Sequence, residues 1–148
     1  MKSFLDTGFL LTLLFKTGGS QSAWEIARRI ETPLFIASLQ IFTTENRILR
    51  QIEAPESTPN QRSMAANALQ NLRWYLEQQV FLPISIDYEI AIDLASQWQK
   101  QAQQVLPALL LLWPAMAATI GATTFLSFDP RTRQLAKSAG LKLLPEKL

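Results

Sequence analysis

The sequence predicts an α/β protein with a central parallel sheet that is covered by helices on both faces. Short apolar segments alternate with longer helix-like segments along the whole chain, which is the pattern of repeated strand–helix units. The segment 122–128 is rich in β-branched and aromatic residues and carries no charge, as expected of a strand buried on both faces. The chain has 148 residues, 48% of them hydrophobic, so we expect one domain over residues 1–148 with a substantial core.

The expected elements follow from apolar periodicity and from residues that break or cap helices. Strands are predicted over residues 2–5, 33–37, 81–84, 122–128 and 141–144. Helices are predicted over residues 9–16, 23–30, 39–52, 61–80, 88–104, 109–120 and 130–139. The tripeptide Asp6-Thr7-Gly8 is expected to form a turn, and Ser38 and Asp87 are expected to cap the helices that follow them. In the helix after Asp87 we expect an inward stripe made of Ile90, Ile92, Leu94, Ala95 and Trp98.

The segment GATTFLSFDPRTRQLAKSAGLKLLP, residues 121–145, is the most informative stretch. Asp129 follows the predicted strand directly and precedes Pro130, which suits the first position of a helix. Gly140 is expected to end that helix. Ligands of open α/β sheets bind at the carboxyl ends of the strands, so Asp129 is either a ligand-binding carboxylate or only a helix cap.

The composition excludes several kinds of catalysis. The chain contains no histidine and no cysteine, which removes Ser-His and Cys-His nucleophile pairs, disulfides and the usual zinc sites. Any catalysis would depend on carboxylates, Lys, Arg, Tyr or hydroxyl groups. The lack of cysteine suits a cytoplasmic protein, and a net charge of +2 is too small to predict nucleic-acid binding by itself.

One segment is long enough to raise the question of a membrane span. Residues 105–128 are uncharged over 24 positions, and about 20 apolar residues can cross a bilayer. Pro107, Pro114 and Gly121 interrupt the segment, and no Lys/Arg cluster flanks it. We therefore expect a buried helix followed by a buried strand, and no membrane association.

Two of the four aspartates, Asp6 and Asp129, occupy the same context between a predicted buried strand and a helix. Carboxylates on neighbouring strand ends, with a third acid from a helix, would form an oxygen site for Mg²⁺ or Mn²⁺. Such a site could activate a water and hydrolyse a phosphodiester. The alternative is that each aspartate is a plain N-cap.

Glu45 is the candidate for the third acid. It continues the helical spacing of Ile41, Ile48 and Ile52, so it lies within an apolar stripe. A carboxylate there is paired, protonated or a ligand, because burying it alone is costly. The other interpretation is that this part of the helix is solvated.

Arginines could contact phosphates, but most charged residues on helices belong to a solvated face. The arginines considered are Arg28, Arg29, Arg47, Arg50, Arg62, Arg131 and Arg133. The sequence contains neither a Gly-rich phosphate loop nor interleaved basic and aromatic residues.

The opening MKSFLDTGFLLTLL and the closing GATTFLSFDPRTRQLAKSAGLKLLP resemble the PIN-domain family, particularly VapC-like toxins of bacterial toxin–antitoxin pairs. The resemblance covers the whole length. It implies a three-layer α/β/α sandwich with a central parallel sheet and the ancestry of a Mg²⁺- or Mn²⁺-dependent endoribonuclease. It also implies RNA as a possible substrate, an antitoxin-like protein as a possible partner, and a homodimer.

The same resemblance implies a four-acid site, which this sequence matches only in part. Asp6 matches the first acid and Asp129 the fourth, so both are predicted metal ligands and catalytic residues, with Glu45 as a third catalytic candidate. The family spacing places Thr43, not Glu45, at the second acid. The third acid falls on Leu110, and leucine cannot hold a cation. We therefore expect ribonuclease activity that is weak or lost, or a non-catalytic protein that binds an antitoxin-like partner, itself or RNA.

Overall fold

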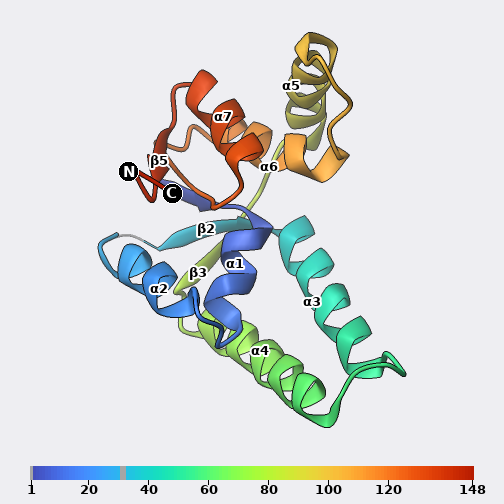
Figure 1. The fold of residues 1–148 in the computed structure, drawn as a ribbon. Helices are drawn as coiled ribbons and strands as arrows, with labels where there is room; N and C mark the ends of the chain where they lie inside the picture. The colour runs from blue at the N-terminus through green and yellow to red at the C-terminus, as the bar shows by residue number, and fades with distance from the viewer. Residues whose placement is uncertain (1, 31–32) are drawn as a thin grey trace.

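The computed structural model describes residues 2–30 and 33–148, which form a five-stranded parallel sheet between two layers of helices (Figure 1). The strand order is β3-β2-β1-β4-β5, and all four neighbouring pairs are parallel. The predicted α/β/α architecture is confirmed. The strands are β1 (Ser3–Leu5), β2 (Leu34–Ala37), β3 (Phe81–Ile84), β4 (Thr124–Leu126) and β5 (Lys142–Leu144).

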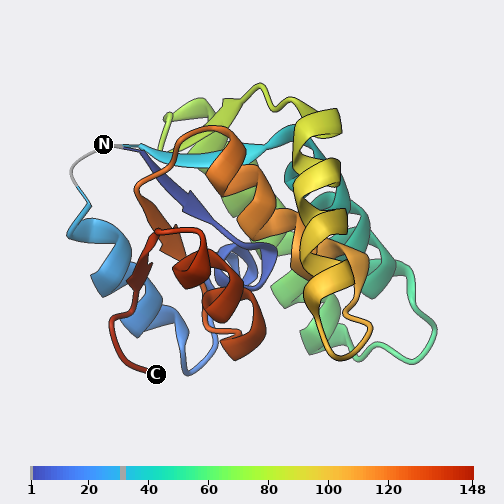
Figure 2. The same ribbon diagram turned by 90° about the horizontal axis from the view of Figure 1, so that it is seen from above.

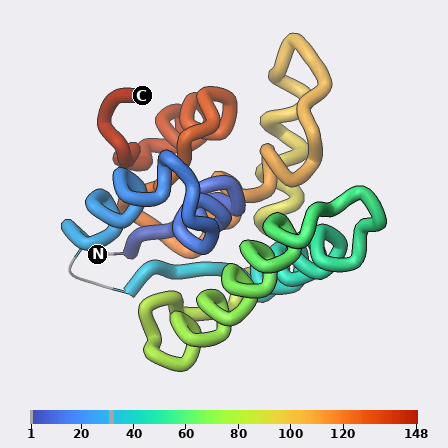
Figure 3. Tube along the Cα trace, turned by 60° about the horizontal axis from the view of Figure 1, so that its bottom comes forward, coloured from blue at the N-terminus to red at the C-terminus, as the bar shows by residue number. Residues whose placement is uncertain are grey.

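The helices divide between the two faces of the sheet. One face is covered mainly by α1, α2 and α4, with α3 packed along α4. The other is covered by α6 and α7, and α5 packs beside α6, as Figure 2 shows. In Figure 3, α3 and α4 form a hairpin that extends beyond the sheet. The helices are α1 (Thr7–Leu14), α2 (Ser20–Arg28), α3 (Ser38–Glu53), α4 (Pro59–Glu77), α5 (Tyr88–Gln101), α6 (Ala108–Thr119) and α7 (Pro130–Ser138).

The central strands are apolar because both of their faces are buried. In β1, Phe4 packs in the core under α6 and α7, whereas Leu5 packs in the core under α1, α2 and α4. Phe125 and Leu126 of β4 divide in the same way. Successive side chains of a strand point to opposite faces, so both cores draw on the same short strands.

The predicted ends of α7 are confirmed. Asp129 is its N-cap and Pro130 its first residue. Gly140 follows the helix with a φ of +84°, a left-handed conformation that glycine adopts without a steric penalty.

Two predicted helix starts are wrong in detail. Asp6-Thr7-Gly8 is not a separate turn, because Asp6 caps α1 and Thr7 is its first residue. Ser38 is not a cap but the first residue of α3. The N-cap is Ala37, whose backbone N–H donates to the Gln40 side chain at 2.8 Å, so a glutamine three residues into the helix replaces the expected serine.

The inward stripe predicted for α5 is confirmed at Leu94, Ala95 and Trp98 but is wrong at its two isoleucines. Ile90 and Ile92 are 56% and 52% exposed, whereas Ala91 and Ala95 are buried. Small residues allow the close approach of α5 to α6, so the bulkier isoleucines lie at the sides of the contact. Among the described residues, no helix is both long and apolar enough to cross a membrane.

Candidate functional site

The candidate site lies at the carboxyl edge of the sheet, where β1 and β4 end side by side. Leu5 pairs with Leu126, so Asp6 and Ser127, the residues that follow, are neighbours. Asp6 is only 3% exposed. Its Oδ1 accepts a hydrogen bond of 2.7 Å from the backbone N–H of Phe9, which is how it caps α1.

The second carboxylate oxygen of Asp6 is enclosed by hydroxyl groups. Ser127 Oγ donates to Asp6 Oδ2, and Thr132 Oγ1 lies 3.4 Å from the same oxygen and 2.7 Å from Ser127 Oγ. Burial raises the pKa of Asp6 above its usual value, the hydrogen bonds from Ser127 and Phe9 oppose this, and the charge of Asp129 adds to it. Asp6 therefore joins β1, β4 and α7 through hydrogen bonds within the protein.

Asp129 is paired with an arginine two residues later. Arg131 donates to Asp129 Oδ1 from its backbone N–H at 2.8 Å and from Nε at 3.2 Å, and to Oδ2 from Nη2 at 2.9 Å. These hydrogen bonds hold the pKa of Asp129 below its usual value. The guanidinium thus contacts both oxygens of the carboxylate and neutralises its charge.

Two further residues hold this edge together. Gln40 is buried, and its Nε2 donates to the carbonyl of Leu5 at 2.6 Å, which connects α3 to the end of β1. Arg133 is also buried and donates to the carbonyls of Ser127 at 2.9 Å and Pro145 at 2.7 Å. Arg133 is thus an exception to the solvated face expected for most of the arginines, because α7 turns this side chain toward the end of β4. Gln40 lies three residues after Ala37, and Arg133 lies four residues after Asp129, and each of these earlier residues caps a helix that follows a strand. This spacing was the sequence feature that could have indicated that Gln40 and Arg133 contact the strand ends.

The other predicted acid positions do not add a carboxylate to this cluster. Leu110 lies half-buried in the first turn of α6. Thr43 Oγ1 donates to the carbonyl of Leu39 at 2.8 Å, within its own helix. Glu45 is half-buried on the face of α3 where Ile41 and Ile48 pack in the core with α4.

A divalent cation does not fit the site as arranged. Mg²⁺ usually keeps several waters and is bound through one or two carboxylates, so those carboxylates must face the ion. Over residues 2–30 and 33–148, no three acidic side chains lie close enough together to share an ion. The oxygens of Asp6 and Asp129 already accept hydrogen bonds from the protein's own donors. The geometry supports a closed structural cluster at this edge.

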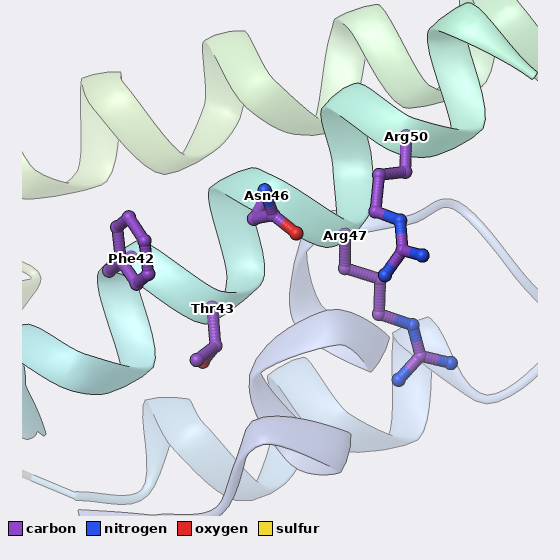
Figure 4. Close-up of a pocket in the computed structure, with 5 residues that line it drawn as sticks. All are labelled: Phe42, Thr43, Asn46, Arg47 and Arg50. Atoms are coloured by element: carbon purple, nitrogen blue, oxygen red, sulfur yellow. The ribbon is translucent and has the colours of Figure 1, made fainter.

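An open, positively charged hollow lies beside α3. Phe42, Thr43, Asn46, Arg47 and Arg50 line a space of about 700 Å³. Figure 4 shows the guanidinium groups of Arg47 and Arg50 extending from the helix in the same direction. Both arginines are exposed. The ion pairs found among the described residues are Arg131–Asp129 and Lys142–Glu146, so neither of these two arginines has an acidic partner there.

Comparison with known proteins identifies the fold. No family model and no curated protein sequence matches the chain. A chain of VapBC2 from Rickettsia felis, a toxin–antitoxin complex solved bound to a DNA fragment from its promoter, superposes with a TM-score of 0.64. The alignment covers 97% of each chain at 13% sequence identity. The chain has a PIN-like fold. At 13% identity the similarity shows the fold alone. Thr43 and Leu110 occupy the two positions at which the sequence resemblance to the PIN-domain family implies acids.

Proposed function

We propose that this chain is a PIN-like protein related to VapC-type toxins that has lost ribonuclease activity and acts by binding an antitoxin-like protein. The observation that carries the proposal is the state of the two strand-end carboxylates. Asp129 is paired with Arg131, and Asp6 is buried among the donors Phe9 N–H, Ser127 and Thr132. A hydrolytic metal site needs carboxylates that face the ion, and here both are bound within the protein.

The fold supports the choice of a protein partner. The VapBC2 complex contains a toxin-like chain together with its antitoxin, and the present chain aligns over almost its full length. The exposed arginines beside α3 offer a surface that is independent of the closed cluster. Binding would therefore survive the loss of catalysis.

The second candidate is a residual Mg²⁺- or Mn²⁺-dependent ribonuclease. Asp6 and Asp129 lie close enough for the charge of Asp129 to raise the pKa of Asp6, which is the arrangement from which a metal site could form. Activity would require Arg131 to leave Asp129 and a further ligand to replace Leu110. We rank this function below binding because ligands that act as a unit fail together.

Calorimetric titration with Mn²⁺, together with cleavage of a mixed RNA substrate, tests the proposal. We expect no saturable heat up to millimolar Mn²⁺ and no cleavage by the wild type. Asp129→Asn serves as the site variant and Asp93→Asn, at an exposed position of α5, as the control. Cleavage by the wild type and the control that disappears in Asp129→Asn would overturn the proposal in favour of the nuclease.

A further inference from the structure

Two adjacent hollows on α3 differ in chemistry but share one arginine. The first, the α3 hollow, is the space lined by Phe42, Thr43, Asn46, Arg47 and Arg50. The second, the α1–α4 hollow, has a volume of about 340 Å³ and lies where α1, α3 and α4 meet. Arg47 lines both, so the two hollows form one continuous surface.

The α1–α4 hollow has an apolar lining. Leu11, Phe15, Ile48 and Met64 contribute hydrocarbon or thioether groups, and Arg47 is the charged residue on its rim. The remaining lining side chains are neutral and polar. A hollow of this size can accept one or two large apolar side chains, since binding sites are typically concave and mostly apolar with a few placed polar groups.

The α3 hollow supplies two positive charges next to this apolar space. Arg47 and Arg50 are three residues apart on a helix, so their side chains leave neighbouring positions on one face. Among the residues that the structure describes, no acidic side chain lines either hollow. Guanidinium groups bind carboxylates with two parallel hydrogen bonds, which makes a pair of carboxylates the matching chemistry.

We propose that the α1–α3–α4 surface binds an amphipathic protein segment that presents two carboxylates to Arg47 and Arg50 and an apolar side chain to the hollow beside Leu11, Phe15 and Met64. The inference rests on the proposed function only for the statement that the partner is a protein. It adds the chemistry of the partner: the segment is acidic and apolar. On a helical segment, acids three or four residues apart with a large apolar residue one turn away satisfy this geometry.

Charge and chemistry favour such a segment over a nucleic acid. Nucleic-acid sites typically neutralise several phosphates, about 6–10 in strong cases, whereas this surface offers two arginines and the whole chain has a net charge of +2. The apolar α1–α4 hollow offers few groups that could bind the charged phosphates of a nucleic acid. The exposed Phe42 could stack with a base, so RNA binding is retained as an outcome of the test.

Selection from a displayed library of random 16-residue peptides on the full-length chain tests the proposal. We expect enrichment of sequences with two Asp or Glu three or four residues apart and a Leu, Ile, Met or Phe within one turn of them. A synthetic peptide from the enriched set is then titrated by fluorescence anisotropy. We expect the double variant Arg47→Glu/Arg50→Glu to weaken binding at least tenfold, and Met64→Gln to weaken it about tenfold.

Arg73→Glu is the matched control, because Arg73 is exposed on α4 and lines neither hollow. It should bind the peptide like the wild type. Urea unfolding of each variant confirms that the fold is retained.

Three results would overturn the inference: no enrichment, enrichment without the acidic pair, or unchanged affinity of the double variant. Binding of a 20-nucleotide uridine RNA that the double variant abolishes, without peptide binding, would assign the surface to nucleic acid. RNA cleavage would instead overturn the proposed function while leaving the peptide result intact. The two failures are therefore distinguishable.

Discussion

The carboxyl edge of the sheet and the outer face of α3 both carry charged side chains, and they differ in how those charges are compensated. At the edge, Asp6 is buried and hydrogen-bonded, and Asp129 is paired with Arg131. On α3, Arg47 and Arg50 are exposed and lie beside a hollow that no acidic residue of the described ranges lines. Compensated charges stabilise a fold, whereas exposed charges of one sign attract a partner. The comparison separates the structural part of the molecule from the part available for binding.

The largest expected effect concerns the hydroxyl that faces Asp6. Ser127→Ala removes the donor to Asp6 Oδ2 and leaves a buried carboxylate without one of its hydrogen bonds, so we expect a loss of about 2 kcal/mol in the free energy of unfolding. Urea denaturation measures it, with Ser96→Ala at an exposed position of α5 as the control. Equal stability of the two variants would show that the edge is not a structural cluster.

A smaller effect is expected at the start of α7. Asp129→Ala removes the N-cap hydrogen bond to the backbone N–H of Arg131, which we expect to destabilise the protein by about 1 kcal/mol. Asp87→Ala, which removes the corresponding cap of α5, provides a measure of capping without a paired arginine. A gain in stability for Asp129→Ala would indicate that the carboxylate is held for another purpose.

The pH dependence of stability should distinguish Asp6 from Asp129. Burial raises the pKa of Asp6 in the folded protein. Above about pH 4 the native state therefore binds more protons than the unfolded chain. As a result, the contribution of Asp6 to stability falls as pH rises through the pKa of the folded state. The pKa of Asp129 is lowered, so its contribution is present above about pH 4 and is lost as pH falls through its folded pKa.

Urea denaturation of the wild type and of Asp6→Asn between about pH 4 and pH 7 measures the contribution of Asp6 to the free energy of unfolding. Relative to the variant, the wild type should gain stability as pH falls over this range. A difference that stays constant with pH would contradict the burial of an ionisable carboxyl at this position.

The smallest effect is expected on α3. Arg47→Gln/Arg50→Gln removes two exposed charges that have no acidic partner among the described residues, so the free energy of unfolding should change by less than about 0.5 kcal/mol. The same urea measurement applies. A loss comparable to that of Ser127→Ala would place these arginines in the structural part of the molecule and weaken the case for a binding surface.

Local chemistry accounts for most of the correct predictions from the sequence. The uncharged β-branched segment around Phe125, the Asp129-Pro130 helix start and the glycine at position 140 each require a particular backbone conformation, and each was predicted correctly. Two local predictions failed, because Asp6 caps α1 directly and Gln40 takes the place expected for Ser38. The failure in α5 depends on packing between elements. The exposure of Ile90 and Ile92 follows from the approach of α5 to α6 through alanines, which periodicity over one helix cannot reveal.

The sequence by itself therefore determined the α/β class, the order of the elements and the positions of Asp6 and Asp129 at strand ends, because these depend on apolar periodicity and on caps. Only the tertiary structure decided what those carboxylates contact. Ser127 and Thr132 reach Asp6 because parallel pairing places the ends of β1 and β4 together, although more than 120 positions separate them along the chain. The metal and catalytic roles predicted for Asp6 and Asp129 stay predictions, which the Mn²⁺ titration and the RNA cleavage measurement test. The catalytic role of Glu45 also stays a prediction.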